Sequence, residues 1–210
     1  DGQQMYEGDE AFFVTCNTRA LLKAERLVLN TMQRMSGIAT LANRYAFEVE
    51  DLSVKVVDTR KTTPNLRFLE KWAVRLGGCY NYRDGLYDRI MIKDNHVDAA
   101  GSVGKAVESV RDFLKEHNME LPMTVEVRNL SELEEVMELG CADRVMLDNF
   151  ELPILAEAVK HVDGRCETEA SGGITLKTIR EVAMTGVDFI SVGALTHSVM
   201  SLDLSLKVVK

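Results

Sequence analysis

The sequence predicts a parallel α/β barrel, either complete or slightly open. From about residue 101 onward, short β-branched apolar runs alternate with amphipathic helical stretches. Strand–helix–strand units of this length join parallel strands by right-handed crossovers. About seven strands can be counted, enough for a sheet to curl into a barrel. A flat doubly wound sheet is the alternative, but no early GxGxxG motif supports a dinucleotide-binding fold.

Whole-chain properties narrow the class of protein. The chain has 210 residues, of which 46% are hydrophobic and 28% charged, as expected for one large domain, or one domain and a fragment. Its net charge of −8 argues against a nucleic-acid partner. No apolar run of membrane-spanning length and no signal peptide is found, so we expect no membrane partner. Four scattered cysteines (Cys16, Cys79, Cys141 and Cys166), without a CxxC pair, predict a reduced, cytoplasmic protein with buried thiols.

The first 45 residues divide into two parts. Residues 1–17 read as a turn and one β-strand around Phe12 to Val14, which would need partners from elsewhere. From Asn17, a candidate N-cap, apolar residues recur every three to four positions and predict a helical region with a bend at Gly37. Arg26 lies within it, as either a solvated charge or an anion ligand.

The other helices and strands are predicted from changes in the spacing of apolar residues along the chain. A helix is expected from Pro64 to Leu76 with Trp72 on its core face, and Ser131 with Glu134 suggests a capping box for a helix ending at Gly140. Other helices are expected at about 103–117, 152–161 and 176–184, and strands at 54–57, 79–83, 88–93, 123–127, 144–147, 166–170 and 188–192.

The segment Asp58–Pro64, of sequence DTRKTTP, follows the first barrel strand and has the composition of an anion site. Arg60 can hold a carboxylate or phosphate with two hydrogen bonds, and Lys61 adds a compact second charge. An isolated Arg-Lys pair is more often a solvated strand end, so the argument depends on what lies beside it. Hydroxyl donors are supplied by Thr59, Thr62 and Thr63.

Further charged residues end the following strands. Because the carboxyl ends of parallel strands meet on one face, we expect Arg60, Arg83 and Lys93 to converge, and such a cluster requires a polyanion. Glu126 and Asp148 lie in apolar strand contexts on the same predicted face. They could pair with the cations structurally, or hold Mg²⁺ or sugar hydroxyls.

The last two strand ends carry small residues before helix starts. Glu169–Ile174 contains a Ser-Gly-Gly sequence, and Ser191–Leu195 contains Val192, Gly193 and Ala194. Free backbone N–H groups of this kind bind a phosphate monoester, and barrels commonly place such a site after their last two strands. The pattern therefore predicts a barrel enzyme whose ligand carries a phosphate at one end and further negative charges at the other.

Long motifs place the chain close to a known family. Residues 22–30, 33–40, 58–64, 69–71, 85–88, 92–96, 169–174 and 191–198 resemble the quinolinate phosphoribosyltransferase family, also called nicotinate-nucleotide pyrophosphorylase (carboxylating), and the resemblance extends from about residue 17 to the end. It implies an N-terminal α/β domain, of which residues 1–17 would be the C-terminal remnant, followed by a helical lead-in and barrel over residues 18–210.

The resemblance also implies a reaction. Quinolinate would condense with 5-phosphoribosyl 1-pyrophosphate, with Mg²⁺, to give nicotinate mononucleotide, pyrophosphate and CO₂ in de novo NAD biosynthesis. A homodimer or higher homo-oligomer is implied, in which Arg26 crosses the interface into the partner's site.

Residue roles follow from the matched motifs. The resemblance implies that Arg26, Arg60, Arg83 and Lys93 hold the quinolinate carboxylates, with Lys61 near the pyrophosphate, and that Glu126 and Asp148 hold the ribose hydroxyls and the metal. Lys61, Lys93, Glu126 and Asp148 would be the catalytic group. The remaining substrate-binding residues would be Thr59, Tyr82, Ser171, Gly172, Gly173, Val192, Gly193 and Ala194.

One residue departs from the family pattern. The family usually has Asn-His-Arg where this chain has Asn81-Tyr82-Arg83. A tyrosine can still donate a hydrogen bond, but it will not become cationic near neutral pH. Two alternatives therefore stay open: a related phosphoribosyltransferase with a different ring-acid acceptor, and a non-catalytic barrel that binds a phosphorylated ligand.

Overall fold

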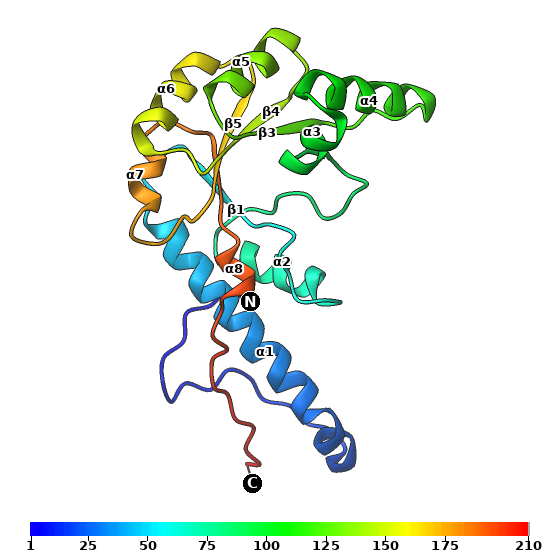
Figure 1. Cartoon of the computed structure of the whole chain (residues 1–210). Coiled ribbons are helices and arrows are strands. Elements are labelled where there is room, and N and C mark those ends of the chain that lie inside the picture. The colour runs from blue at the N-terminus through cyan, green and yellow to red at the C-terminus, as the bar shows by residue number, and fades with distance from the viewer. Residues whose placement is uncertain (210) are drawn as a thin grey trace.

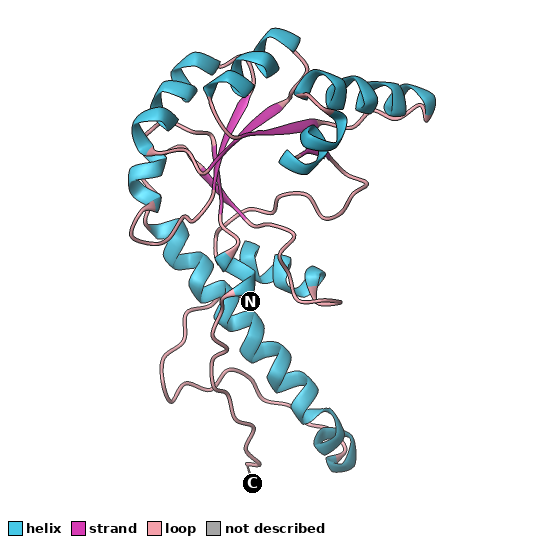
Figure 2. Ribbon diagram, viewed as in Figure 1, coloured by secondary structure: helices cyan, strands magenta, loops and turns pink. Residues whose placement is uncertain are grey.

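The computed structural model describes residues 1–209, and its centre is a six-stranded, all-parallel sheet. The strands lie in the order β1-β6-β5-β4-β3-β2 and curl around a common interior (Figures 1 and 2). The α/β barrel prediction is confirmed in its open form. The strands are β1 (Lys55–Val57), β2 (Ile90–Ile92), β3 (Met123–Val127), β4 (Arg144–Asp148), β5 (Glu167–Ser171) and β6 (Phe189–Ser191).

Helices connect the strands and cover the outside of the sheet. In Figure 1, α4 to α7 follow one another around the outer face, while the long α1 lies beyond the edge near β1. No helix in residues 1–209 is both long and apolar enough to cross a membrane. The helices are α1 (Thr18–Phe47), α2 (Arg67–Leu76), α3 (Asp94–Ala100), α4 (Val103–Glu116), α5 (Leu130–Leu139), α6 (Leu152–Val162), α7 (Ile179–Ala183) and α8 (Ala194–His197).

Alternation along the strands separates an apolar outer face from a polar interior. Val125, Leu147 and Ala170 are almost completely buried beneath the helices. Their sequence neighbours face the opposite way, and side chains from different strands meet there: Lys93 with Glu126, and Arg144 with Glu169. The barrel interior is therefore lined by charged and hydroxyl groups that have partners on adjacent strands.

The barrel is open between residues 80–83 and β2. The expected strand at 79–83 forms only an isolated bridge from Tyr80 to Val57 of β1. Beyond Tyr80 the backbone leaves the ladder, because the amide of Tyr82 donates to the Asp58 carboxylate at 2.8 Å rather than to a strand carbonyl. Side-chain hydrogen bonding thus ends the sheet at this edge.

Three expectations about the first 76 residues were wrong. Residues 12–14 form no strand, since no other strand lies alongside to pair with them. The helix expected at Pro64 begins at Arg67, because Asn65 adopts a left-handed φ of 65° that a helix cannot contain. Trp72 is 43% exposed, and α2 instead buries two charged residues, Glu70 and Lys71, whose ion pairs compensate their desolvation.

Smaller differences concern caps and thiols. The cap of α5 is Asn129, whose side chain accepts from the amide of Glu132, so the expected Ser131–Glu134 box is wrong, although Gly140 ends the helix as expected. Residues 94–100 form the unexpected helix α3 directly after β2. All four cysteines are free, but only Cys79 is buried and Cys16 is exposed.

Candidate active site

Arg60 and Arg83 lie close together where the chain leaves β1 and its neighbouring bridge. The Nε atom of Arg60 is buried and donates to no acceptor, the one such side-chain atom among residues 1–209. Burial lowers the pKa of Arg83, and the neighbouring Arg60 lowers it further. Two adjacent guanidinium groups, one with an unsatisfied buried donor, form a site that favours an anion.

Lys93 and Glu126 bring the next two strand ends together. The Lys93 Nζ atom lies 2.6 Å from Glu126 Oε2, and Glu126 is only 7% exposed. Lys93 also begins α3, and its backbone amide donates to His96 Nδ1 at 2.9 Å. The lysine is thus fixed by its backbone while its side chain remains half-exposed toward the interior.

Asp148 is joined to the Ser-Gly-Gly turn through Asn149. Asp148 pairs with Ser171 in the parallel register, and the amide of Asn149 donates to the Ser171 carbonyl at 2.8 Å. The Asn149 side chain donates to Asp148 Oδ2 at 2.7 Å and also lies against Gly172, where a Cβ atom would be 2.1 Å from Asn149 Oδ1. Glycine is required at this close approach.

The loop after β6 contacts the segment that carries the first two cations. The Thr196 hydroxyl donates to the Lys61 carbonyl at 2.9 Å, and a Cβ on Gly193 would lie 3.1 Å from Lys61 Cδ. Lys61 therefore extends beside the last turn of the barrel. Four amides of the two glycine-containing turns donate to no protein acceptor within residues 1–209: those of Gly172, Gly173, Gly193 and Ala194.

A buried carboxylate, Asp58, fixes the two arginine-bearing segments relative to each other. Its side chain is completely buried and accepts from Lys71 Nζ at 2.5 Å, from Asn81 Nδ2 at 2.6 Å and from the amide of Tyr82 at 2.8 Å. Burial raises the pKa of Asp58, and Lys71 opposes that shift. Asp58 thus joins α2, the end of β1 and residues 81–82 beneath Arg60 and Arg83.

Glu70 supports the other side of the same segment. It accepts from the Thr63 amide at 3.0 Å and from Arg34 Nη2 of α1 at 2.9 Å. Arg34 also donates to the carbonyl oxygens of Thr196 and Val199 beyond β6. The Thr59–Thr63 loop is therefore held between α1, α2 and the last turn of the barrel.

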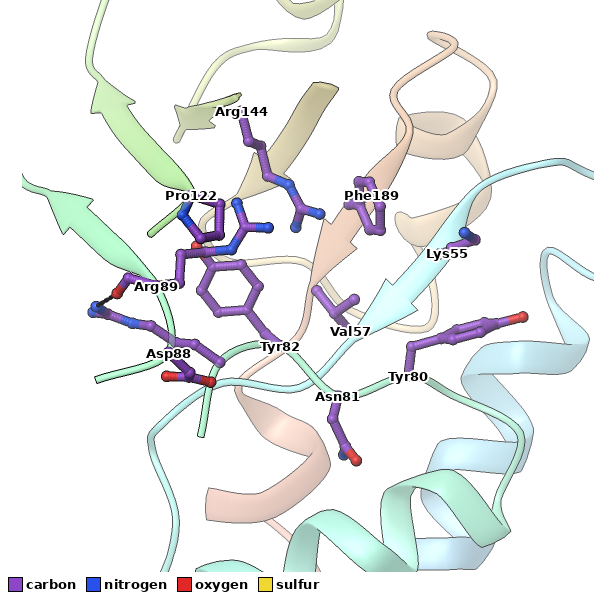
Figure 3. A pocket seen from close by; sticks show the side chains of 11 residues that line it. Lys55, Val57, Tyr80, Asn81, Tyr82, Asp88, Arg89, Pro122, Arg144 and Phe189 are labelled. Atoms are coloured by element: carbon purple, nitrogen blue, oxygen red, sulfur yellow. Dashed lines mark hydrogen bonds between the residues drawn. The ribbon is translucent and has the colours of Figure 1, made fainter. Parts of the chain in front are cut away.

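Tyr82 points into the barrel rather than toward the arginine pair. Its hydroxyl donates to Thr124 Oγ1 at 2.8 Å, and its ring lies between the guanidinium groups of Arg89 and Arg144, at 5.8 and 5.4 Å (Figure 3). Burial raises the pKa of Tyr82, with a further contribution from Glu169. The phenol is consequently neutral over the physiological range.

Arg26 is the predicted site residue that this chain does not bring to the others. It is exposed in the N-terminal part of α1, which extends away from the sheet (Figure 1). The remaining predicted residues lie at the carboxyl ends of β1 to β6 or in the loops that follow them, but the Tyr82 side chain points back into the barrel.

Comparison with known proteins decides the family. A family model described as the quinolinate phosphoribosyl transferase C-terminal domain matches residues 38–207. The chain belongs to the quinolinate phosphoribosyltransferase family. A relative named nicotinate-nucleotide pyrophosphorylase [carboxylating], chloroplastic, from Arabidopsis thaliana is 46% identical over 99% of the chain, and a probable nicotinate-nucleotide pyrophosphorylase from Bacillus subtilis is 45% identical.

A solved structure of a quinolinate phosphoribosyltransferase relative has the same fold. NadC from Streptococcus pyogenes superposes with a TM-score of 0.91 and 43% identity over 99% of the chain and 71% of its own length. The chain spans 63% of the Arabidopsis relative and 71% of the Bacillus relative. The family resemblance inferred from the motifs is thereby confirmed.

Sequence reasoning missed the groups that hold the candidate active site in place. Asp58, Lys71 and Arg34 were not singled out, although an acid between a buried strand and two cations is a recognisable signal for Asp58. Arg34 and Lys71 gave no such signal, since charged residues at helical spacing usually face solvent. Within residues 1–209, no group of three or more His, Cys, Asp or Glu side chains is placed to hold a metal ion.

Proposed function

We propose that the chain carries the phosphoribosyl-transfer site of a quinolinate phosphoribosyltransferase, which converts quinolinate and 5-phosphoribosyl 1-pyrophosphate to nicotinate mononucleotide, pyrophosphate and CO₂. The observation that carries the proposal is the buried, unsatisfied Arg60 Nε beside Arg83, at the same barrel end as two carboxylates and two turns with free amides. The names of the relatives support this substrate pair.

Arg60, Arg83 and Lys93 would bind the two carboxylates of the acceptor. Guanidinium groups hold planar carboxylates with paired hydrogen bonds, which fixes the ring nitrogen for attack on the ribose. The Lys93 ammonium now pairs with Glu126 at 2.6 Å and would be shared with the acceptor on binding. The cationic surroundings would also stabilise the negative charge that develops on the ring as CO₂ leaves.

Glu126 and Asp148 would face the ribose. Departure of pyrophosphate leaves positive charge on the sugar, which adjacent carboxylates stabilise. Both carboxylates also suit Mg²⁺, which needs only one or two protein carboxylates when substrate phosphates supply other ligands. Glu126 and Asp148 would hold the ion, whose charge would neutralise the leaving pyrophosphate.

The two glycine-containing turns would bind the 5-phosphate. The free amides of Gly172, Gly173, Gly193 and Ala194 supply donors without a competing protein acceptor. The Ser171 side chain at the end of β5 adds a hydroxyl. Thr59 and Lys61 would lie between this phosphate and the pyrophosphate, because Lys61 extends beside Gly193.

Arg26 would act in a homodimer. Its exposed position on α1, outside the barrel end formed by its own chain, suits a residue that enters the site of a second subunit. The position of an exposed cation on a long, projecting helix supports this arrangement. Val192 would serve as backbone support for the phosphate turn, since its side chain is buried.

A second candidate function differs only in the acceptor. Tyr82 replaces the histidine expected at the acceptor pocket and directs its hydroxyl to Thr124. The acceptor would then receive no contact from this residue, which favours a related ring acid with fewer polar substituents.

Product analysis tests the proposal. The protein is incubated with 5-phosphoribosyl 1-pyrophosphate and Mg²⁺, and with quinolinate, nicotinate or no acceptor. Nicotinate mononucleotide and CO₂ from quinolinate, with matching pyrophosphate release, is the expected result. Faster mononucleotide formation from nicotinate than from quinolinate would favour the second candidate, and tight binding without pyrophosphate release would contradict both.

A further inference from the structure

A cavity of about 330 Å³ extends along the open side of the barrel, from residues 80–83 to the amino ends of the strands. Its lining includes the first residues of three strands, Lys55, Arg144 and Phe189, and Pro122 just before β3. Figure 3 shows these side chains around a common space that Tyr82 borders from within the barrel. The cavity therefore opens at the amino ends of the strands, whereas Lys93, Glu126 and Asp148 lie at the carboxyl ends.

The charge of this amino-end cavity is not balanced by the protein. Arg144 pairs with the two carboxylates of Glu167 and Glu169, each at 2.8 Å, so this group of three carries one negative charge. Lys55 and Arg89, by contrast, form no ion pair with any residue in 1–209. Two cations without a carboxylate partner at the edge of a small cavity favour an anionic ligand.

The acid in the lining forms no ion pair with these cations. Asp88 uses its oxygens to accept from the amides of Asp84 and Gly85, at 2.6 and 3.0 Å. The Arg89 guanidinium donates to Thr124 Oγ1 at 3.2 Å, its only side-chain hydrogen bond within the described chain. Since a guanidinium has five N–H donors, Arg89 retains donors for a ligand carboxylate.

Flat apolar surfaces accompany the cations. The Lys55 Nζ atom lies 5.7 Å from the ring centre of Tyr80 and 5.6 Å from that of Phe189. Val57 and Pro122 complete an apolar wall. A ligand with a carboxylate and an aromatic ring could place its charge at Arg89 and Lys55 and its ring against these side chains.

We propose that the amino-end cavity binds a small aromatic monocarboxylate, with Arg89 as the carboxylate ligand and the apolar side chains of Val57 and Pro122 as the ring contact. Binding would be coupled to the candidate active site, because Arg83 borders both spaces. This coupling rests on the proposed function, but the binding site itself does not. Coupling of this kind is reciprocal: an acceptor held by Arg83 would change the affinity for the second ligand by the same factor.

Calorimetric titration of the protein with benzoate tests the site. The variants are Arg89→Gln, Arg89→Lys and, to remove the acceptor site, Arg60→Ala; circular dichroism and urea unfolding establish that each is folded. We expect one benzoate per chain to remain bound in Arg60→Ala, a loss of affinity of about tenfold or more in Arg89→Gln, and a smaller loss in Arg89→Lys.

Three results would each overturn the proposal. The unmodified protein could fail to bind benzoate, Arg60→Ala could lose binding, or a folded Arg89→Gln could bind with unchanged affinity. Lys55→Gln provides a second variant if Arg89→Gln does not fold, and it should weaken binding in the same direction. Turnover of quinolinate is not part of the readout, so failure of the proposed function leaves this test intact.

Discussion

The Nζ atom of Lys71 lies 2.5 Å from Asp58 Oδ1, and both side chains are almost entirely buried. The pair joins α2 to the end of β1, directly before Arg60. Because Asp58 also accepts from Asn81 and the Tyr82 amide, one carboxylate sets the relative positions of the two arginine-bearing segments. A buried ion pair, and not only the residues of the loop itself, therefore sets the position of the cationic site.

Lys71→Met should destabilise the protein strongly. Removing one partner of a buried ion pair leaves an uncompensated charge and typically costs about 3–5 kcal/mol. Urea unfolding measures the change, with Lys177→Met, at an exposed lysine, as the matched control. A loss below about 1 kcal/mol, as for a surface pair, would show that the pair does not hold the fold together.

Gly172→Ala should abolish binding of the 5-phosphate. This loss should exceed the effect of placing an alanine in a left-handed backbone conformation alone. The new Cβ would lie 2.1 Å from Asn149 Oδ1, so Asn149 and with it Asp148 must move. Gly164→Ala is the control, because its φ of 70° is also left-handed but nothing lies within 4 Å of the added carbon. We expect the control to lose only about 1–2 kcal/mol in unfolding free energy and to keep phosphate affinity. Equal effects of the two substitutions would contradict the contact argument.

Cys79 should resist alkylation in the folded protein, whereas Cys16 should react. Burial, with Asp58 nearby, raises the pKa of Cys79 to about 12, and its Sγ donates to the Ala42 carbonyl at 3.2 Å. Little thiolate therefore forms below pH 12, and the reagent cannot reach the sulfur. Peptide mass spectrometry after iodoacetamide treatment should find Cys16 modified and Cys79 intact, at neutral and mildly alkaline pH. Modification of both at similar rates would contradict the burial of Cys79.

Tyr82→His should make stability depend on pH. Burial and the Arg89 and Arg144 guanidinium groups would oppose protonation of an imidazole here more than the nearby Glu169 carboxylate, already paired with Arg144, would favour it. Its folded-state pKa would therefore lie below ~6.5. The unfolded state then binds more protons below ~6.5, and the unfolding free energy falls as pH decreases. Tyr82→Phe, which loses only the hydrogen bond to Thr124, should differ from the unmodified protein by about 1 kcal/mol at every pH. If the unfolding free energy of Tyr82→His changed with pH in the same way as that of Tyr82→Phe, residue 82 would not lie beside the two guanidinium groups.

The sequence predicts the barrel well because, along its strands, residues that face the helices alternate strictly with residues that face the interior. Val125 and Val127 face the helices while Glu126 faces the interior, a pattern that is visible without any structure. Parallel topology alone predicts that Arg60, Arg83 and Lys93 lie at the same end of the barrel.

Long-range side-chain partners were beyond sequence reasoning. The buried face of α2 contains Glu70 and Lys71, whose partners Arg34 and Asp58 lie 36 and 13 residues away along the chain. Helical periodicity therefore selected Trp72 for the core, although it is half-exposed. The strand expected at 79–83 failed for a similar reason, since the Asp58 carboxylate takes the Tyr82 amide that a ladder would have used. Tertiary hydrogen bonding overrode local preference in both places.

The central claim is that cations, acids and free amides from separate strand ends act on one ligand. The most direct measurement is quinolinate-dependent nicotinate mononucleotide formation by Arg60→Ala, compared with Lys177→Ala as a surface control. The account predicts that kcat/KM falls by about a hundredfold or more in Arg60→Ala, because an acceptor carboxylate loses its guanidinium partner, and stays unchanged in the control. A folded Arg60→Ala protein with kcat/KM within about twofold of the unmodified enzyme would contradict it.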